Sequence, residues 1–380
     1  MGHIYKTESD KWRAVIEIGN SRKRRRKTKT FTTKKEAEVW LSQQKTDQND
    51  GYKLDPDDIS FIDFANRWLE KHKKRTVAAT TYKQYKARIK SHFKPFFKDI
   101  KLKDIEPVHI EEYFDRKRKF GNLNDGSSLS ENTLKKHYVE MNLIFKRAIK
   151  LKIIKYNPMQ AIEAPIPEKK KAPVMNKAEF NKLLAASRND DLIFTFILTI
   201  LLTGLRRSEA LGLEWEDIDL DFGILHVRKR YVLVEGGQLH EEKTKTASSN
   251  RKIKMPEKLI EVLKQFKNNK RKNQLRLGKA FYKEKDFVFC KANGKPYNIK
   301  HYNDKFNEYL EAAALPGKYS IHTLRHTFAT VNLKNDIEPK IIQEMLGHST
   351  ISTTLDIYSH VDLEMQNEAA SKINDVVSFE

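Results

Sequence analysis

Two polar interruptions divide this 380-residue sequence into three parts. The first, residues 51–60, contains Asp55-Pro-Asp-Asp58, and the second, residues 166–175, holds the cationic run Glu168-Lys-Lys-Lys171 between prolines. Proline lacks an amide donor and clustered charges resist burial, so neither segment is expected to form regular structure. The sequence therefore predicts three domains, over residues 1–50, 61–165 and 176–380, joined by two linkers.

The first part combines short strands with one helix. Residues 2–6 and 12–18 alternate between apolar and polar side chains, and a third strand is expected at 27–31. Thr33 and Glu36 form a capping box that predicts a helix start. Six consecutive cations precede the third strand, which favours a DNA-binding sheet over a solvated tail. These candidate DNA-binding residues are Arg22, Lys23, Arg24, Arg25, Arg26 and Lys27.

The second part has the apolar spacing of helices. From Phe61, apolar side chains recur at i+3, i+4, i+7 and i+8, which gives one apolar stripe. Another helix is expected from about Thr80, and a long one after the polar loop at residues 121–130. Cations recur on the polar faces, which favours a bundle that clamps duplex phosphates over ordinary solvation. The candidates on the second helix are Lys83, Lys86 and Arg88.

The third part is expected to be mostly helical around one buried helix. Residues 192–202 form the longest apolar run, which is too short to cross a bilayer. Asn176 and Glu179 predict the first helix start, and residues 224–256 a β segment. The expected fold class is multidomain α+β: a small three-stranded sheet with a helix, a helical bundle, and a mostly α domain with a small antiparallel sheet.

Charge and cysteine content narrow the partners and the compartment. With 73 Lys+Arg against 51 Asp+Glu, the net charge is +22, so a polyanion is the expected partner. The single cysteine, Cys290, excludes an intrachain disulfide or a cysteine zinc site and favours a reducing, cytoplasmic compartment. No secretory signal, basic amphipathic helix or lipidation motif indicates a membrane.

Residues that handle phosphate esters lie in the third part. Arg206 and Glu209 are three apart, so the carboxylate can hold the guanidinium, although a purely structural ion pair is equally compatible. Downstream come His322, Arg325 and His326, and then His348 and Tyr358. Arginine binds phosphate oxygens bidentately, histidine carries protons near neutral pH, and tyrosine can attack phosphorus. A zinc pair of His322 and His326 is disfavoured because an arginine lies between them.

These motifs together resemble the tyrosine recombinase family, and specifically the integrases of phages and conjugative elements. The resemblance rests on several motifs in the family's order and extends over essentially the whole chain. It implies an arm-type DNA-binding domain at residues 1–50, a SAM-like core-binding domain at 61–165 and a catalytic domain at 176–380. The matching motifs are Thr203-Gly-Leu-Arg206-Arg-Ser-Glu209, Lys245-Thr-Ala-Ser-Ser249, His322-Thr-Leu-Arg325-His326, Leu346-Gly-His348 and Tyr358.

The resemblance also implies a role for each matching residue. Arg206 and Arg325 would hold the scissile phosphate, and Tyr358 would be the nucleophile that forms a 3′-phosphotyrosyl link. His322 would help to deprotonate the tyrosine, and His348 would hydrogen-bond the phosphate. Lys245 would protonate the leaving 5′-oxygen, while Glu209 would orient Arg206 and His326 would support the site.

One of these assignments is open from the sequence. Lys243 and Lys245 are each followed by threonine, so spacing does not decide which lysine is the general acid. Lys245 is preferred because Ser248, Ser249 and Arg251 then fit the family's spacing better.

The implied activity is site-specific recombination that integrates and excises a mobile element. The expected partners are double-stranded DNA with core-type and arm-type sites, a homotetramer assembled on that DNA, and accessory DNA-bending and directionality factors. No cofactor or metal is expected, because the phosphotyrosine conserves the bond energy. The expected location is the cytoplasm of a bacterial host, at its nucleoid. The alternatives are a type IB topoisomerase and a DNA-binding regulator that has lost catalysis.

Overall fold

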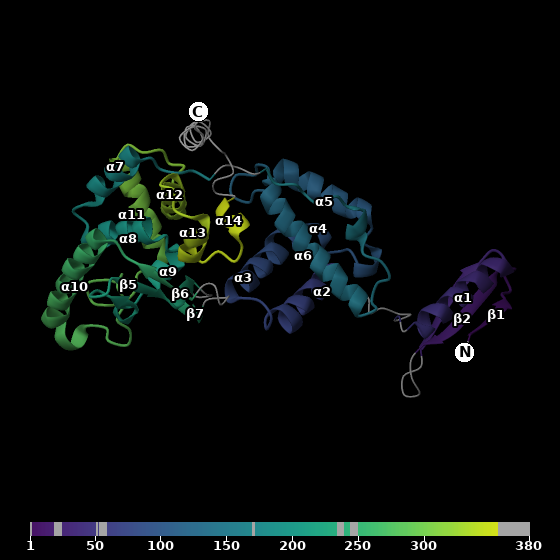
Figure 1. Cartoon of the computed structure of the whole chain (residues 1–380). Coiled ribbons are helices and arrows are strands. Elements are labelled where there is room, and N and C mark those ends of the chain that lie inside the picture. Colours follow the sequence, from purple (N-terminus) through teal and green to yellow (C-terminus); the bar gives the residue numbers. More distant parts are fainter. Residues whose placement is uncertain are drawn as a thin grey trace, which may run out of the picture. The chain divides into compact units, whose positions relative to one another are not determined.

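The computed structural model describes residues 2–18, 25–50, 52, 59–168, 172–233, 239–243 and 250–355 (Figure 1). The chain divides into two compact units, Met1–Lys169 and Lys170–Glu380. The boundary lies inside the second polar interruption of the sequence. The first unit contains a small sheet with its helix followed by a helical bundle, and the second is mostly helical with two small sheets.

The N-terminal module is the expected three-stranded sheet with one helix. Strands β1 (Gly2–Lys6), β2 (Trp12–Ile18) and β3 (Arg25–Phe31) are antiparallel in the order β1-β2-β3. Helix α1 (Lys34–Asn49) begins at the predicted capping box. Its buried side chains pack with those of β2, so the module has a small core of its own; this core contains Ala14, Ile16, Ala37 and Leu41.

The helical bundle follows in the same unit and has a largely aromatic core. Its buried rings include Phe61, Phe93, Phe97, Tyr113 and Phe145. Two of its helices continue into π-helical turns. The elements are α2 (Phe61–Trp68), η1 (Leu69–Lys73), α3 (Ala79–Arg88), η2 (Ile89–Phe93), α4 (Lys94–Phe97), η3 (Leu102–Asp104), α5 (Pro107–Phe120), α6 (Glu131–Lys150) and η4 (Pro158–Ala161).

The second unit is built around helix α8 (Asp191–Thr203), which is the apolar run that the sequence predicts to be buried. It packs against α7 (Lys177–Ser187), α9 (Arg207–Leu211), α10 (Glu257–Leu277), α11 (Ile299–Ala312) and α12 (Ile321–Lys334). The remaining helical segments are η5 (Trp215–Asp217), η8 (Gly278–Ala280), α13 (Pro339–Leu346) and α14 (Ile351–Leu355).

The predicted β segment contributes strands to two small antiparallel sheets rather than the one expected, and a strand that precedes it completes the first. Strands β4 (Ile218–Asp219), β5 (Ile224–Val227) and β8 (Arg251–Lys254) pair in the order β4-β5-β8. Strands β6 (Lys229–Leu233) and β7 (Leu239–Lys243) form the other sheet. Throughout the ranges described above, no helix is long and apolar enough to span a membrane.

Candidate active site

Two helices of the second unit end at glycines that place their C-terminal carbonyls close together. Gly204 caps α8 with φ +66°, and Gly347 caps α13 with φ +65°; both lie in the left-handed region that glycine tolerates best. A Cβ added at Gly204 would lie 2.6 Å from Phe328 Cδ1 and 2.7 Å from Leu346 Cδ2. The absence of a side chain therefore lets the end of α8 pack tightly against α12 and α13.

The two predicted phosphate-binding arginines meet at these helix ends. Arg325 of α12 donates from Nη1 to the Gly204 carbonyl at 2.6 Å and from Nη2 to the Leu346 carbonyl at 2.7 Å. Arg206 donates from Nη2 to the Gly347 carbonyl at 3.0 Å. Because Leu346 and Gly347 are consecutive, both guanidinium groups lie at one point of the fold. These contacts use only part of each guanidinium's five N–H donors.

A buried carboxylate joins Arg206 to a third arginine. Glu209 accepts from Arg206 Nη1 at 2.7 Å and from Arg251 Nη2 at 3.0 Å. The Arg251 side chain is only 6% exposed, and its Nε donates to the Met345 carbonyl. Burial alone would raise the pKa of Glu209, but Arg251 and Arg206 outweigh it, so the pKa is lowered. Glu209 thus stays ionised and holds Arg206, as the sequence predicts.

Arg251 is the residue of this site that the sequence interpretation did not include among its candidates. It served there only as a spacing marker for Lys245. Its place at the start of a short strand gives no pattern that indicates burial. Only the tertiary fold shows that it shares Glu209 and extends the cluster to α13.

His322 and His326 lie one helical turn apart on α12, with their rings perpendicular and 4.6 Å between centroids. His322 is exposed, and the protein around its ring, with the charges of His326 and Arg325, lowers its pKa to about 4. Partial burial and Arg325 also lower the pKa of His326. Both rings are therefore neutral near pH 7. No group of three or more His, Cys, Asp or Glu in the described ranges is placed to hold a metal ion.

His348 follows the Gly347 cap and is oriented by a hydroxyl. Its Nδ1 lies 2.9 Å from Oγ1 of Thr354, a buried residue of α14. Burial, followed by the charges of Arg325 and Arg206, lowers the pKa of His348 to about 3. The ring is neutral, and if the Thr354 hydroxyl donates to Nδ1, the proton lies on Nε2. That tautomer makes Nε2 a hydrogen-bond donor, in a ring whose pKa the charges of the two arginines help to lower.

Comparison with known protein families agrees with this geometry. Residues 173–365 match the model of the phage integrase family, which is just over half of the chain. The chain belongs to the phage integrase family. Residues 60–117 also match the model of the phage integrase N-terminal SAM-like domain. The recombinase therefore has the family's catalytic domain in its second unit. The first part of its helical bundle matches the SAM-like domain of the family.

Individual relatives extend the likeness over most of the chain. The recombinase is 26% identical to the tyrosine recombinase XerC-like protein of Caldanaerobacter subterraneus subsp. tengcongensis, over 98% of this chain and 97% of that protein. It is also 26% identical to the integrase of Staphylococcus phage L54a, over 84% and 94% respectively. Its fold resembles that of the Tn1549 transposon integrase in complex with transposon right end DNA, with a TM-score of 0.70, 21% identity and coverage of 83% and 100%.

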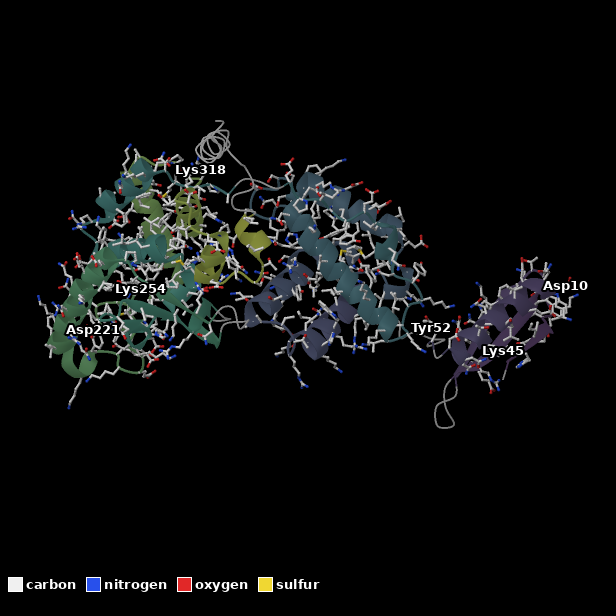
Figure 2. All side chains as sticks on the ribbon, in the orientation of Figure 1. Asp10, Lys45, Tyr52, Asp221, Lys254 and Lys318 are labelled. Atoms are coloured by element: carbon white, nitrogen blue, oxygen red, sulfur yellow. The ribbon has the colours of Figure 1, made fainter. Side chains whose placement is uncertain are left out.

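Two predicted catalytic residues, Lys245 and Tyr358, lie outside the described residues. The structure describes the backbone of Lys243, which ends β7 of the recombinase and pairs with Lys229 of β6. Lys254, labelled in Figure 2, lies in β8, and its Nζ donates to the Phe222 carbonyl at 2.6 Å. The choice between Lys243 and Lys245 thus remains a prediction.

The helical bundle places the predicted DNA-binding residues of α3 on different sides. Lys83 and Lys86 are exposed, as expected for a basic outer face. Arg88 turns inward instead: its side chain is 14% exposed and forms an ion pair with the fully buried Glu140 of α6. The prediction that Arg88 lies on the outer face is wrong, because a buried carboxylate in α6 holds its guanidinium.

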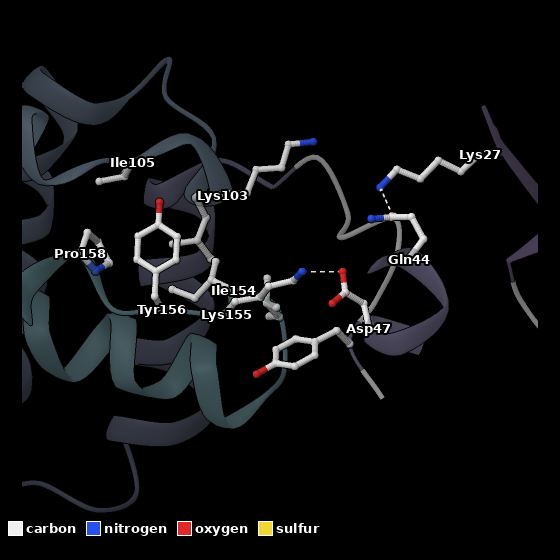
Figure 3. A pocket seen from close by; sticks show the side chains of 12 residues that line it. Lys27, Gln44, Asp47, Lys103, Ile105, Ile154, Lys155, Tyr156 and Pro158 are labelled. Carbon is white, nitrogen blue, oxygen red and sulfur yellow. Dashed lines mark hydrogen bonds and ion pairs between the residues drawn. The ribbon is translucent and has the colours of Figure 1, made fainter. Parts of the chain in front are cut away.

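The predicted cationic run of the N-terminal module is also divided. Arg22, Lys23 and Arg24 lie outside the described residues, and Arg25 begins β3. Arg26 is exposed, 3.8 Å from Glu17 across the sheet. Lys27 points the other way and donates from Nζ to Gln44 Oε1 at 3.1 Å (Figure 3). Because successive side chains of a strand alternate in direction, Arg26 and Lys27 do not share one face of the sheet. Figure 3 also shows the ion pair of Lys155 with Asp47 in this unit.

Proposed function

We propose that this recombinase is the integrase of a mobile genetic element and that it cuts and rejoins double-stranded DNA at attachment sites. The observation that carries the proposal is the convergence of Arg206 and Arg325 on the adjacent carbonyls of Gly347 and Leu346. Two fixed guanidinium groups match the oxygens of one phosphate diester. Relatives named as recombinase and phage integrase support the same activity.

In the proposed reaction, the Tyr358 oxygen attacks the scissile phosphorus. The new Tyr358–phosphorus bond replaces the bond from phosphorus to the 5′-oxygen, so the products are a 3′-phosphotyrosyl link and a free 5′-hydroxyl. Arg206 and Arg325 stabilise the charge that accumulates on the phosphate oxygens in the transition state. Attack by another strand's 5′-hydroxyl reverses these steps and joins the exchanged strands without a metal or a nucleotide cofactor.

Two protons must move in this step. Tyrosine has an ordinary pKa of about 10, so it needs a base near neutral pH. His322 is the proposed base: its ring is neutral near pH 7, so a ring nitrogen can accept the proton. Lys245 is the proposed acid that protonates the leaving 5′-oxygen, with Lys243 as the alternative. His348 would donate from Nε2 to the phosphate, and His326 would support the ring of His322.

The remaining parts of the chain have proposed DNA-binding roles. Residues 1–50 would bind arm-type sites through the sheet, and residues 61–165 would bind the core-type site, with Lys83 and Lys86 on its phosphates. Residues 176–380 would be the catalytic domain.

Because recombination of two duplexes requires four strand cleavages, the proposed assembly is a homotetramer on DNA. It would act at DNA in the cytoplasm of a bacterial cell, together with DNA-bending and directionality factors.

A nicked suicide substrate tests the catalytic proposal. The substrate is a duplex that carries the element's own attachment junction, with a nick next to the cleavage position. The wild-type chain should form a denaturant-resistant adduct, and Tyr358→Phe should bind the duplex normally without forming one. Wild-type amounts of adduct in this variant would remove Tyr358 as nucleophile. Adducts on DNA without an attachment site would indicate a topoisomerase, and no wild-type adduct a binding protein.

Deletion of residues 1–50 tests the division of labour between the domains. The truncated chain should cleave short core-site duplexes as the full chain does, but it should lose integration that depends on arm sites. Full integration by the truncated protein would contradict the proposed arm-binding role.

A further inference from the structure

Arg207 lies beside the proposed active site. The proposed chemistry gives this cation no role. It follows Arg206 directly and is the first residue of α9. Its Nη1 donates to Oδ1 of Asn303 at 2.7 Å, which connects α9 to α11. The charge of Arg207 also contributes to lowering the pKa of His322. Its guanidinium therefore lies within electrostatic range of the exposed ring at the edge of the site.

The partner of Arg207 is a neutral amide, whereas several other arginines of this unit pair with a carboxylate. Arg206 and Arg251 both pair with Glu209, and Arg228 pairs with Asp217. In the ranges that the structure describes, no carboxylate lies within ion-pairing distance of Arg207. An amide oxygen fixes the direction of a guanidinium but does not neutralise it. The full positive charge of Arg207 is thus held in place and remains available.

The local charge exceeds what one phosphate requires. Arg206, Arg207, Arg251 and Arg325 contribute four positive charges around the site, and Glu209 offsets one of them. The nearby histidines are neutral near pH 7, and a phosphate diester carries a single negative charge. A stretch of DNA backbone presents further phosphates on both sides of the one being cleaved.

We infer that Arg207 binds a second backbone phosphate, adjacent to the scissile one, and that Asn303 is the positioning residue that aims its guanidinium. This inference rests on the proposed function, because it extends the same DNA site by one phosphate. The competing explanation is that the Arg207–Asn303 hydrogen bond only ties α9 to α11. A structural tie would affect stability and leave the salt dependence of DNA binding unchanged.

The experiment measures the affinity of the full-length chain for a labelled duplex that carries the element's attachment junction, over a series of salt concentrations. Arg207→Gln should lower the affinity at every salt concentration and reduce the slope of log K against log salt by about one, as expected for one lost phosphate contact. Arg276→Gln is the matched control, because it removes the same charge from an exposed residue in the last turn of α10. Its slope should equal that of the wild type.

Asn303→Asp provides a second variant that keeps Arg207. The new carboxylate should pair with the guanidinium and neutralise it, so this variant should show the same reduced slope as Arg207→Gln. Thermal melting shows whether each variant is folded. An unchanged slope in folded Asn303→Asp or Arg207→Gln would overturn the inference. If the wild-type chain neither binds nor cleaves the junction duplex, the proposed function fails instead, so the two failures are distinguishable.

Discussion

Both units of the recombinase bury a glutamate against arginine, with opposite consequences. In the second unit, Glu209 binds two guanidinium groups, and its pKa is lowered. In the helical bundle, Glu140 binds Arg88 alone, and burial raises its pKa to about 8 although Arg88 opposes the rise. The number of cations around a buried carboxylate therefore decides whether it remains charged at neutral pH.

The residues around Glu140 also help to explain why its pKa is raised while that of Glu209 is lowered. Two histidines lie nearby, His92 of η2 and His137 of α6, with 4.8 Å between ring centroids. Burial lowers the pKa of His137 to about 3 and that of His92 to about 4, so neither ring supplies a positive charge near pH 7. Tyr113 contacts His137 Nδ1 at 2.8 Å. The two histidines of this cluster thus add no positive charge beside Glu140, whereas Glu209 has two guanidinium groups beside it.

The largest effect is expected from neutralising Glu209. Glu209→Gln leaves Arg206 and Arg251 without a counter-charge in a buried environment, which should lower the free energy of unfolding by about 3–5 kcal/mol. Because Arg206 also loses its orienting partner, cleavage should fall by roughly 100-fold or more. Urea unfolding and single-turnover cleavage of the nicked junction measure the two effects. A destabilisation below about 1 kcal/mol would mean that the carboxylate does not organise the site.

A smaller effect concerns the pH dependence of the bundle. An unfolded histidine binds a proton near pH 6.5, but the folded bundle excludes protons from His137 and His92 until about pH 3 and pH 4. The unfolded state thus binds more protons than the folded state in this window. The contribution of the two histidines to stability therefore falls as the pH falls below 6.5. His137→Gln should reduce this slope by up to about 1.4 kcal/mol per pH unit.

Urea unfolding between pH 6.5 and pH 4.5 measures that slope, with His226→Gln in β5 of the other unit as control. Glu140 acts oppositely, because its raised pKa lowers stability as the pH rises from about 4.5 to about 8. The comparison of His137→Gln with wild type cancels that contribution. Equal slopes in the two proteins would show that His137 becomes protonated within the folded bundle.

The smallest effect is expected from the isosteric change at Glu140. Burial raises the pKa of Glu140 to about 8 against the charge of Arg88 alone, so its ion pair should be weaker than those of Glu209, and Glu140→Gln should lower the free energy of unfolding by less than Glu209→Gln does. Urea unfolding at pH 7 compares it directly with Glu209→Gln. A loss as large as that of Glu209→Gln would show that Glu140 is ionised, and the contrast between the two clusters would disappear.

Local patterns in the sequence predicted the parts of the site that depend on near neighbours. The spacing of Arg206 and Glu209 predicts the contact that the structure contains. The same approach failed for Arg88, because its partner Glu140 lies on another helix and the lysines around it suggest an exposed face. It also did not identify Arg251, whose partners lie on α9 and α13.

The sequence by itself determined the kinds of elements, the capping boxes at Thr33 and Asn176, the helical path of the apolar run 192–202 and the set of residues with phosphate chemistry. Those features depend on side chains a few positions apart, so their spacing is visible in the chain. Only the tertiary structure decided which charges are buried together and which direction each guanidinium faces. Burial and the number of neighbouring charges come from segments distant in sequence, and these two quantities separate Glu209, whose pKa is lowered, from Glu140, whose pKa is raised.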